Sequence, residues 1–172
     1  MIPRIRNILY ATDLSRNSAY AFRWAVNSAQ KHDARIHILH VLEKLSPAEE
    51  TTLSLHAYLP QLEKIRKETR EDLVDRIKKR LNEFAGRELR DDAETLKRVA
   101  SILVVDGDPA DEILKQADEL NCDVVIMGTH GKGLIKHTFL GSVSEKVLHR
   151  VRKPVFIIPI PKEDTDITFN DI

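Results

Sequence analysis

The sequence predicts an α/β fold, a single domain built on a parallel β-sheet with helices on both faces. Short apolar runs alternate with segments that repeat apolar residues every three or four positions, along the whole chain. The runs are apolar on both faces, as strands are when helices cover both sides. At 172 residues, the chain is long enough for one core and too short for two ordinary domains. We expect a three-layer sandwich with a five-stranded, mainly parallel sheet in residues 1–161, then a loose tail at 162–172.

The first unit of this pattern reads as strand, helix and strand. Asn7–Ala11 is an apolar run that ends at the polar sequence TDLS of residues 12–15. The next segment has residues at helical spacing, namely Ala21, Trp24, Ala25, Ser28 and Ala29. After a short polar break, the β-rich run RIHILHV at residues 35–41 predicts a second strand. These residues together predict a βαβ unit.

A long helix is predicted after an irregular segment. Residues 45–60 follow no period and contain Pro47 and Pro60, which indicates a loop with room for a short helical turn. This segment is a candidate lid, dimer element or partner surface. Beyond it, residues recur at three- and four-residue steps, at Leu62, Ile65, Thr69, Leu73, Ile77, Leu81 and Phe84. Charged residues fill the other faces as far as Arg90, so one long amphipathic helix is expected.

The remaining chain continues the alternation. Residues 98–105 predict a third strand, and the sequence DGDP at 106–109 predicts a turn, an aspartate cap and a proline in the first helical turn. That helix is expected to direct four apolar residues inward, Ile113, Leu114, Ala117 and Leu120. A fourth strand over 124–127, a helix over 142–151 and a final strand over 154–160 complete the pattern. In such sheets ligands bind beyond the carboxyl ends of the strands, where the strand order reverses.

Composition excludes several classes of protein. Lys plus Arg and Asp plus Glu both number 27, so the net charge is zero and argues against a binder of nucleic acid or membrane that relies on bulk positive charge. The single cysteine, Cys122, excludes an intrachain disulfide and a cysteine-based zinc site. The first apolar run stops at Asp13, too short and polar for a signal peptide or membrane span. We expect a soluble, cytoplasmic protein.

The most informative stretch is GTHGKGLIKHTFLGS, which runs from Gly128 to Ser142 directly after the apolar run VVIM. It places Gly128, Gly131 and Gly141 around a loop and Ser142 at the start of a helix. Unpaired backbone amides and the helix dipole both favour an anion, so the stretch predicts a phosphate site. Glycines in such loops often serve turn geometry alone, but three of them in register with Ser142 favour binding.

Two common phosphate motifs do not fit this loop. A Walker loop, GxxxxGK[ST], requires a hydroxyl residue where Gly133 stands and a glycine where Ile126 stands. A dinucleotide fingerprint requires a glycine where Lys136 stands. The spacing is instead Gly, two residues, Gly, nine residues, Gly and Ser.

This spacing resembles the glycine loop of the universal stress protein family, in its nucleotide-binding subgroup. The resemblance covers nearly the whole chain, because ILYATDLS, the second strand ending in HV, the turn GDPADEIL, the glycine loop and VRKPVFIIP follow in the family's order. It implies a Rossmann-like, adenine nucleotide alpha hydrolase-like fold for the single domain. It also implies a stress-response regulator, a sensor or switch, that binds ATP, ADP or AMP.

The glycine loop is expected to supply the phosphate and ribose contacts. Gly128 has no Cβ and lets a sugar approach closely, while Gly131 and Gly141 can adopt positive φ and direct amides at phosphate oxygens. Ser142 offers a hydroxyl, and Val143 offers a backbone amide at the helix start. Lys132, Lys136 and His137 are alternative cations for a triphosphate, and the sequence does not choose among them.

The adenine is expected across the carboxyl ends of the first two strands. In the family that this chain resembles, the position of Asp13 helps to hold the nucleotide and the backbone at Val41 reads the adenine edge. Ala11, Thr12 and Met127 are expected to line the cleft. For Asp13 two other roles stay open, a cap of the first helix and an ion pair with a nearby cation.

Metal binding and catalysis receive less support from the sequence. His37 and His40 lie three apart on a strand and therefore face opposite sides. His130 lies in the phosphate loop, which leaves two interpretations: contact with a phosphate or a bound cation, and exposure to solvent, which is favoured. A Mg²⁺ that bridges phosphates, with Asp13 as a further ligand, fits any ATP site. Because Asp13 is the only carboxylate placed at the cleft, no catalytic residue is assigned, and slow ATP hydrolysis, autophosphorylation and a nucleotide-independent scaffold remain the alternatives.

The last apolar run, Val155–Ile158, is expected to end the sheet, where an unpaired edge invites pairing with a second chain. The family resemblance implies a homodimer through this strand.

Overall fold

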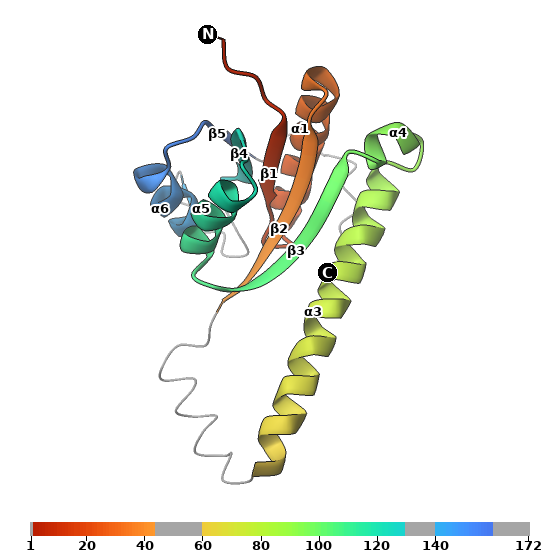
Figure 1. Cartoon of the computed structure of the whole chain (residues 1–172), viewed down its shortest axis with the longest axis vertical. Coiled ribbons are helices and arrows are strands. Elements are labelled where there is room, and N and C mark those ends of the chain that lie inside the picture. Colours follow the sequence, from red (N-terminus) through yellow and green to blue (C-terminus); the bar gives the residue numbers. More distant parts are fainter. Residues whose placement is uncertain (1, 44–59, 130–139, 160–172) are drawn as a thin grey trace.

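The computed structural model describes residues 2–43, 60–129 and 140–159, and it confirms the three-layer α/β architecture (Figure 1). The strands are β1 (Asn7–Ala11), β2 (Arg35–Glu43), β3 (Val99–Gly107), β4 (Val124–Gly128) and β5 (Val155–Ile158). They form a 5-stranded sheet in the order β3-β2-β1-β4-β5, and every neighbouring pair is parallel. The chain first builds outward from β1 to β3 and then returns to β4, so the strand order reverses between β1 and β4. A ligand crevice is expected at this reversal.

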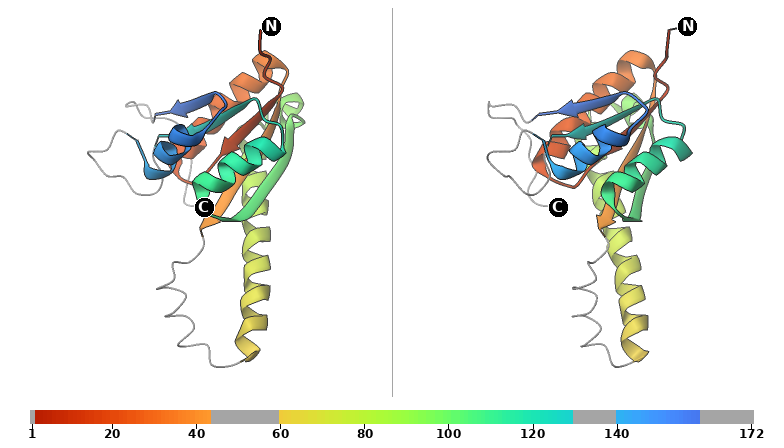
Figure 2. Two further views of the ribbon diagram at one scale, coloured as in Figure 1. Left: turned by 60° about the vertical axis from the view of Figure 1, so that its left-hand side comes forward. Right: turned by 90° about the vertical axis from the view of Figure 1, so that its left-hand side faces the viewer.

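Helices cover both faces of the sheet. The helices α1 (Arg16–His32), α3 (Pro60–Glu88) and α4 (Ala93–Leu96) lie on one face, and α5 (Pro109–Glu119) and α6 (Ser142–Arg150) lie on the other. Turned views show the two layers and the N-terminal part of α3 extending past the sheet (Figure 2). None of the helices in the described residues is both long enough and apolar enough to span a membrane.

The core between α1, α3 and the sheet is built around three aromatic rings. Tyr10 of β1 and Phe22 of α1 lie 5.2 Å apart between ring centroids, and Phe22 lies 5.1 Å from Phe84 of α3. Alanines of α1 bring the helix close to the sheet, at Ala21, Ala25 and Ala29. Trp24 was expected in this stripe, but the structure leaves it 46% exposed. At 100° per residue it falls at the border of the stripe, where the tightly packed alanine helix offers no room for an indole.

The opposite core joins α5 and α6 to the other face of the sheet. All of β4 is buried, and Val125 and Met127 point to this side, together with Ile113 and Ala117 of α5. Of the residues predicted to face inward on α5, Leu114 and Leu120 are only partly buried. Asp108 caps α5 by accepting hydrogen bonds from two backbone amides, as predicted.

Several elements differ from the sequence prediction in their bounds or were not predicted. The turn predicted at residues 106–109 begins later, because β2 continues to Glu43 and gives Asp106 and Gly107 ladder partners. The short helix α4 was not predicted, since Ala93–Leu96 contains too few residues to show a period. The final strand is shorter than residues 154–160 and occupies one edge of the sheet. Residues 45–59 and the tail at 162–172 fall outside the described residues.

Candidate functional site

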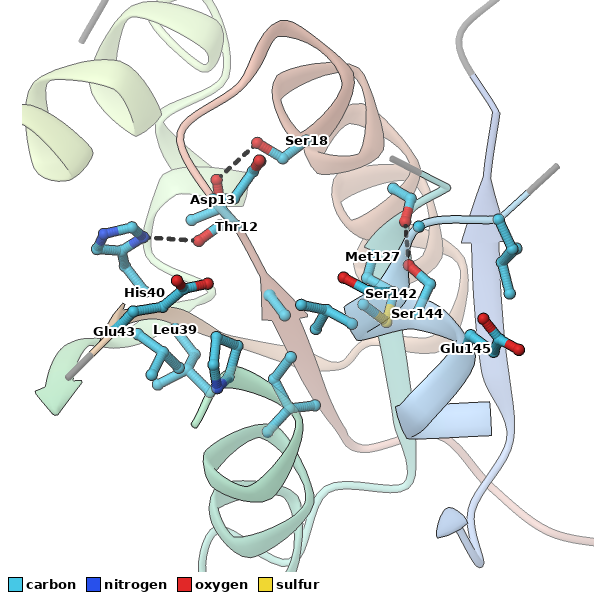
Figure 3. A pocket seen from close by; sticks show the side chains of 18 of the residues that line it. Thr12, Asp13, Ser18, Leu39, His40, Glu43, Met127, Ser142, Ser144 and Glu145 are labelled. Atoms are coloured by element: carbon cyan, nitrogen blue, oxygen red, sulfur yellow. Dashed lines mark hydrogen bonds between the residues drawn. The ribbon is translucent and has the colours of Figure 1, made fainter. Parts of the chain in front are cut away.

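A cleft of about 750 Å³ opens at the carboxyl ends of β1, β2 and β4, where the strand order reverses (Figure 3). Its volume falls in the range of pockets that hold nucleotide-sized ligands, roughly 300–1,000 Å³. Every predicted site residue that the structure describes lines this cleft: Ala11, Thr12, Asp13, Val41, Met127, Gly128, Gly141, Ser142 and Val143. Gly131 lies outside the described residues, as do His130, Lys132, Lys136 and His137.

The turn from β1 into α1 forms one wall of the cleft and is held by its own side chains. The hydroxyl of Thr12 accepts the amide of Leu14 at 3.0 Å and shares a hydrogen bond of 2.8 Å with the Ser18 hydroxyl. Leu14 adopts a φ of 65°, in the left-handed region that a leucine rarely visits. Such strain persists only where surrounding contacts hold it, and it often marks a binding site.

Asp13 projects from this turn and has one oxygen free for a ligand. Its Oδ1 accepts the amide of Ser15 at 3.1 Å, whereas Oδ2 is buried without a hydrogen-bond partner in the structure. The helix cap is Ser15 instead, whose hydroxyl accepts the amide of Ser18, so the capping alternative for Asp13 is wrong. A buried carboxylate oxygen without a partner is costly, and a donor on a ligand relieves that cost.

The end of β2 forms the next wall and offers its backbone to the cleft. The amide of Thr12 donates to the carbonyl of Leu39 at 2.9 Å, and the β1 ladder ends there. In a parallel ladder the backbone groups of alternate residues point to the same neighbour, so those of Val41 point to the side of β1. Because β1 has already ended, they face the cleft. His40, 7% exposed, bonds to the carbonyl of Thr12 at 2.8 Å through Nδ1 and so ties the two strands together.

The end of β4 and the start of α6 form the opposite wall. Gly141 is the N-cap of α6, with a φ of −71° and no side-chain hydrogen bond to the helix. The prediction that Gly141 takes positive φ and directs its amide at phosphate is therefore wrong, since its amide donates to the carbonyl of Thr129 at 2.7 Å. The amides of Ser142 and Val143 lie in the first turn, where a helix has no internal acceptor for them. First-turn amides and the helix dipole are features that favour an anion.

Gly128 has a packing role that the sequence does not reveal. A Cβ at this position would lie 2.7 Å from Nδ2 of Asn17 and 3.0 Å from its Cγ. Asn17 is 2% exposed and belongs to α1, which crosses the sheet at this point. The close approach of α1 to the end of β4 therefore explains the glycine directly.

Acidic residues also lie at the cleft. The prediction that Asp13 is the only carboxylate there is wrong, because Glu43 of β2 and Glu145 of α6 line it as well. In Figure 3, Glu43 lies on the same side of the cleft as Asp13, and Glu145 lies at the far side, near α6. Within the described part of the chain, no three His, Cys, Asp or Glu side chains gather in a way that could hold a metal ion.

Further cleft residues were missed by sequence reasoning. Pro109 and Ile113 of α5 line the cleft, and so does Leu140, which precedes the N-cap of α6. The DGDP turn already placed the start of α5 at the carboxyl end of β3, which is the signal that could have found Pro109. Ser144 lines the cleft too, and nothing in its sequence context separates it from an ordinary helix serine.

The comparisons with known proteins agree on one family. The sequence profile of the universal stress protein family matches residues 4–159. Universal stress protein MJ0577 of Methanocaldococcus jannaschii is 30% identical over 157 residues, covering 89% of this chain and 94% of that protein. A solved structure of MJ0577 matches with a TM-score of 0.68 and 26% sequence identity, covering 94% of this chain and 100% of that chain.

Two more distant structures share the fold. A universal stress protein in complex with cAMP matches with a TM-score of 0.51 at 20% identity, covering 91% of this chain and 98% of that chain. A universal stress protein family protein of Arabidopsis thaliana with AMP bound matches with a TM-score of 0.52 at 18% identity, covering 91% of this chain and 93% of that chain.

Proposed function

The chain belongs to the universal stress protein family, and we propose that it is a regulatory protein, a sensor or switch in the stress response, that binds an adenine nucleotide in the cleft. ATP is the proposed ligand, with ADP or AMP as the other occupants. Two proteins of the same fold bind adenine nucleotides, cAMP in one and AMP in the other, and this supports the ligand class.

The observation that carries the proposal is the polarity of the cleft. The start of α6 offers first-turn amides at one wall, and Asp13 offers a buried carboxylate oxygen without a partner at the other. A nucleotide has the matching polarity, because its phosphates accept hydrogen bonds and its ribose hydroxyls donate them. The cleft volume of about 750 Å³ accommodates such a molecule.

The ligand is proposed to lie with its phosphates on α6 and its adenine on β2. The amides of Ser142 and Val143 and the hydroxyl of Ser142 receive the phosphates. Oδ2 of Asp13 accepts a hydrogen bond from the ribose. The backbone of Val41 pairs with the adenine edge, because its amide and carbonyl point past the end of β1 into the cleft.

Regulation rather than rapid catalysis is the proposed role. Phosphoryl transfer needs a metal cradle and a group that orients the nucleophile. Among the described residues, no group of three or more His, Cys, Asp or Glu side chains forms such a cradle. Any Mg²⁺ would be held mainly by the phosphates themselves. Slow hydrolysis or autophosphorylation remains the alternative function, and incubation with γ-labelled ATP separates the two by whether label is released or transferred.

Two experiments test nucleotide binding. Mass spectrometry of small molecules released from protein purified without added nucleotide should find an adenine nucleotide at a near-equal molar ratio. Isothermal titration of nucleotide-free protein with ATP should show one site per chain. A folded protein that carries no nucleotide and gives neither heat nor a thermal shift with ATP would leave only the scaffold role.

Family membership also supports a proposal for the oligomeric state and for the location. We propose a homodimer through Val155–Ile158, because β5 ends the sheet and carries a Phe156 that is 37% exposed. We also propose a cytoplasmic location, which fits a single cysteine that is buried and free.

A further inference from the structure

We propose that Ser144 is a positioning residue for the phosphate end of the cleft, which holds the first turn of α6 against the end of β4. The inference rests on the proposed function, because it concerns the amides that receive the phosphates. Ser144 is 3% exposed. Its hydroxyl lies 3.0 Å from the carbonyl oxygen of Gly128 and 3.4 Å from that of Thr129, and these contacts attach the helix to the strand end.

The start of α6 needs an anchor of this kind because it has no side-chain cap. Ser15 caps α1 and Asp108 caps α5, each through a side chain that accepts first-turn amides. Gly141 caps α6 without a side-chain hydrogen bond. The first-turn amides of α6 therefore stay available to an anion. Ser144 holds the first turn by donating its hydroxyl to the carbonyl of Gly128. It therefore does not occupy the first-turn amides of α6.

Thr129, whose carbonyl lies near the Ser144 hydroxyl, is itself hydrogen-bonded to three elements. The carbonyl of Thr129 accepts the amide of Gly141 at 2.7 Å, which joins it to the start of α6. Its amide donates to the carbonyl of Ile158 at the end of β5, at 3.1 Å. Its hydroxyl accepts Nδ2 of Asn17 of α1 at 3.3 Å. Thr129 is 8% exposed, so these bonds are made away from bulk water.

Loss of the Ser144 hydroxyl removes its hydrogen bond to the carbonyl of Gly128 at the end of β4 and lets the first turn of α6 shift. Hydrogen bonds to phosphate depend steeply on distance and angle, so a small shift weakens them. The nucleoside half of the ligand lies on β1 and β2 and does not contact this turn. The change should therefore weaken binding of the phosphates and spare binding of the nucleoside.

Isothermal titration of four proteins with ATP and with adenosine tests the inference. Ser144→Ala should bind ATP about tenfold more weakly than wild type, and adenosine within about twofold of wild type. Ser144→Thr keeps a hydroxyl and should recover most of the ATP affinity. Ser28→Ala is the matched control, because Ser28 is also a buried serine, 8% exposed, but lies outside the cleft lining. It should bind both ligands as wild type does.

Results other than these would reject either the role of Ser144 or the proposed function. If Ser144→Ala binds ATP as tightly as wild type does, the positioning role is wrong although nucleotide binding stands. Equal losses for ATP and adenosine would mean a general loosening of the fold and would also reject it. A wild-type protein that binds neither ligand overturns the proposed function itself. If Ser144→Ala does not fold, Ser144→Cys replaces it, since a thiol fills nearly the same space but donates weakly, and the same selective loss is expected.

Discussion

The backbone amide of Gly141 donates a hydrogen bond of 2.7 Å to the carbonyl oxygen of Thr129, and this bond closes the base of the glycine-rich loop. Thr129 directly follows β4 and Gly141 directly precedes α6. The bond therefore fixes the end of a buried strand to the start of a helix. Gly141 thus orients the wall of the cleft instead of contacting a ligand through its amide. The wall of the cleft that is proposed to receive the phosphates therefore depends on how β4 and α6 are placed relative to each other.

Asp13→Asn should weaken the binding of ATP and of adenosine alike. The change keeps the size of the side chain and leaves an oxygen for the amide of Ser15, but it removes the charge of the unpaired Oδ2. A hydrogen bond to a charged group contributes about 1.5–3 kcal/mol, so we expect both affinities to fall by about tenfold or more. Isothermal titration with the two ligands measures the effect.

Asp33→Asn is the matched control for this change. Asp33 ends α1 in the left-handed conformation, which asparagine also tolerates, and it forms an exposed ion pair with Arg98. Its substitution should leave both affinities at the wild-type value. Should Asp13→Asn bind adenosine normally, the proposed contact with the ribose is wrong.

Gly128→Ala should destabilise the protein even when no ligand is present. The added methyl group would lie 2.7 Å from Nδ2 of the buried Asn17, and overpacking of this kind costs about 1–3 kcal/mol. We expect a lower midpoint in thermal unfolding of the nucleotide-free protein. Asn17→Ala removes the side chain that the new methyl group would meet. Gly128→Ala should therefore lower stability less in the Asn17→Ala background than in the wild-type protein.

Gly86→Ala controls for the general effect of replacing a glycine. Gly86 lies inside α3, and a Cβ there meets nothing within 4 Å. Alanine at this site should stabilise the protein by about 0.5–1 kcal/mol, because it restricts the unfolded chain and favours the helix. A Gly128→Ala protein as stable as wild type would show that α1 can move away from β4.

The order of strands and helices was predictable because each element carries a local signal. The periods of the apolar residues and the proline after Asp108 depend only on nearby sequence, and the structure confirms the predicted strand–helix alternation and the cap at Asp108. The surroundings of the cleft residues, in contrast, could be seen only once the fold was known. The contact of Gly128 with Asn17 joins residues far apart in the chain, and no period or motif reports it.

The fine geometry of the glycine loop was predicted less well for the same reason. Gly141 was expected to take positive φ, but its conformation is set by the bond to Thr129. Ser144 looks like any helix serine until β4 is placed beneath it. Glu43 became a cleft residue only because β2 continues past the end of β1. In each case the role of the residue depends on another segment that the folded sheet places next to it.

The cap of α5 should make stability depend on acid pH. The hydrogen bond from the Asp111 amide is the main cause that lowers the pKa of Asp108 below its usual value, and Lys146 adds to it. A carboxyl group with a lowered pKa stabilises the folded state when ionised. That contribution is present above about pH 4 and is lost as the pH falls through the lower pKa of the folded state.

Asp108→Ala tests this in urea unfolding at several pH values. At pH 7 the variant should be less stable than wild type by about 1 kcal/mol, the usual contribution of a helix cap. The difference should shrink as the pH falls below about 4. Asp108→Asn keeps a capping oxygen without the charge, so its stability relative to Asp108→Ala should change little with pH. A constant difference between wild type and Asp108→Ala would show that ionisation of Asp108 does not contribute.

Cys122 should be unreactive in the folded protein. Burial raises the pKa of its thiol to about 11, and the residue is 2% exposed. The thiolate is the reactive form, so at pH 8 we expect little modification by iodoacetamide until the protein is unfolded. Mass spectrometry of the intact protein measures the adduct with and without denaturant. Rapid labelling of the folded protein would show that the entrance to β4 opens readily.

Phe156→Lys should convert the proposed dimer into a monomer. Phe156 is 37% exposed on β5, an edge strand, and a charged side chain there would have to lose its water on pairing. Ala100→Lys places the same charge on an exposed site of β3, at the opposite edge, and is the matched control. Sedimentation velocity over a range of concentrations should show a dimer for wild type and Ala100→Lys and a monomer for Phe156→Lys. Dissociation by Ala100→Lys alone would place the interface on β3, because only the strand that pairs is sensitive to a new charge.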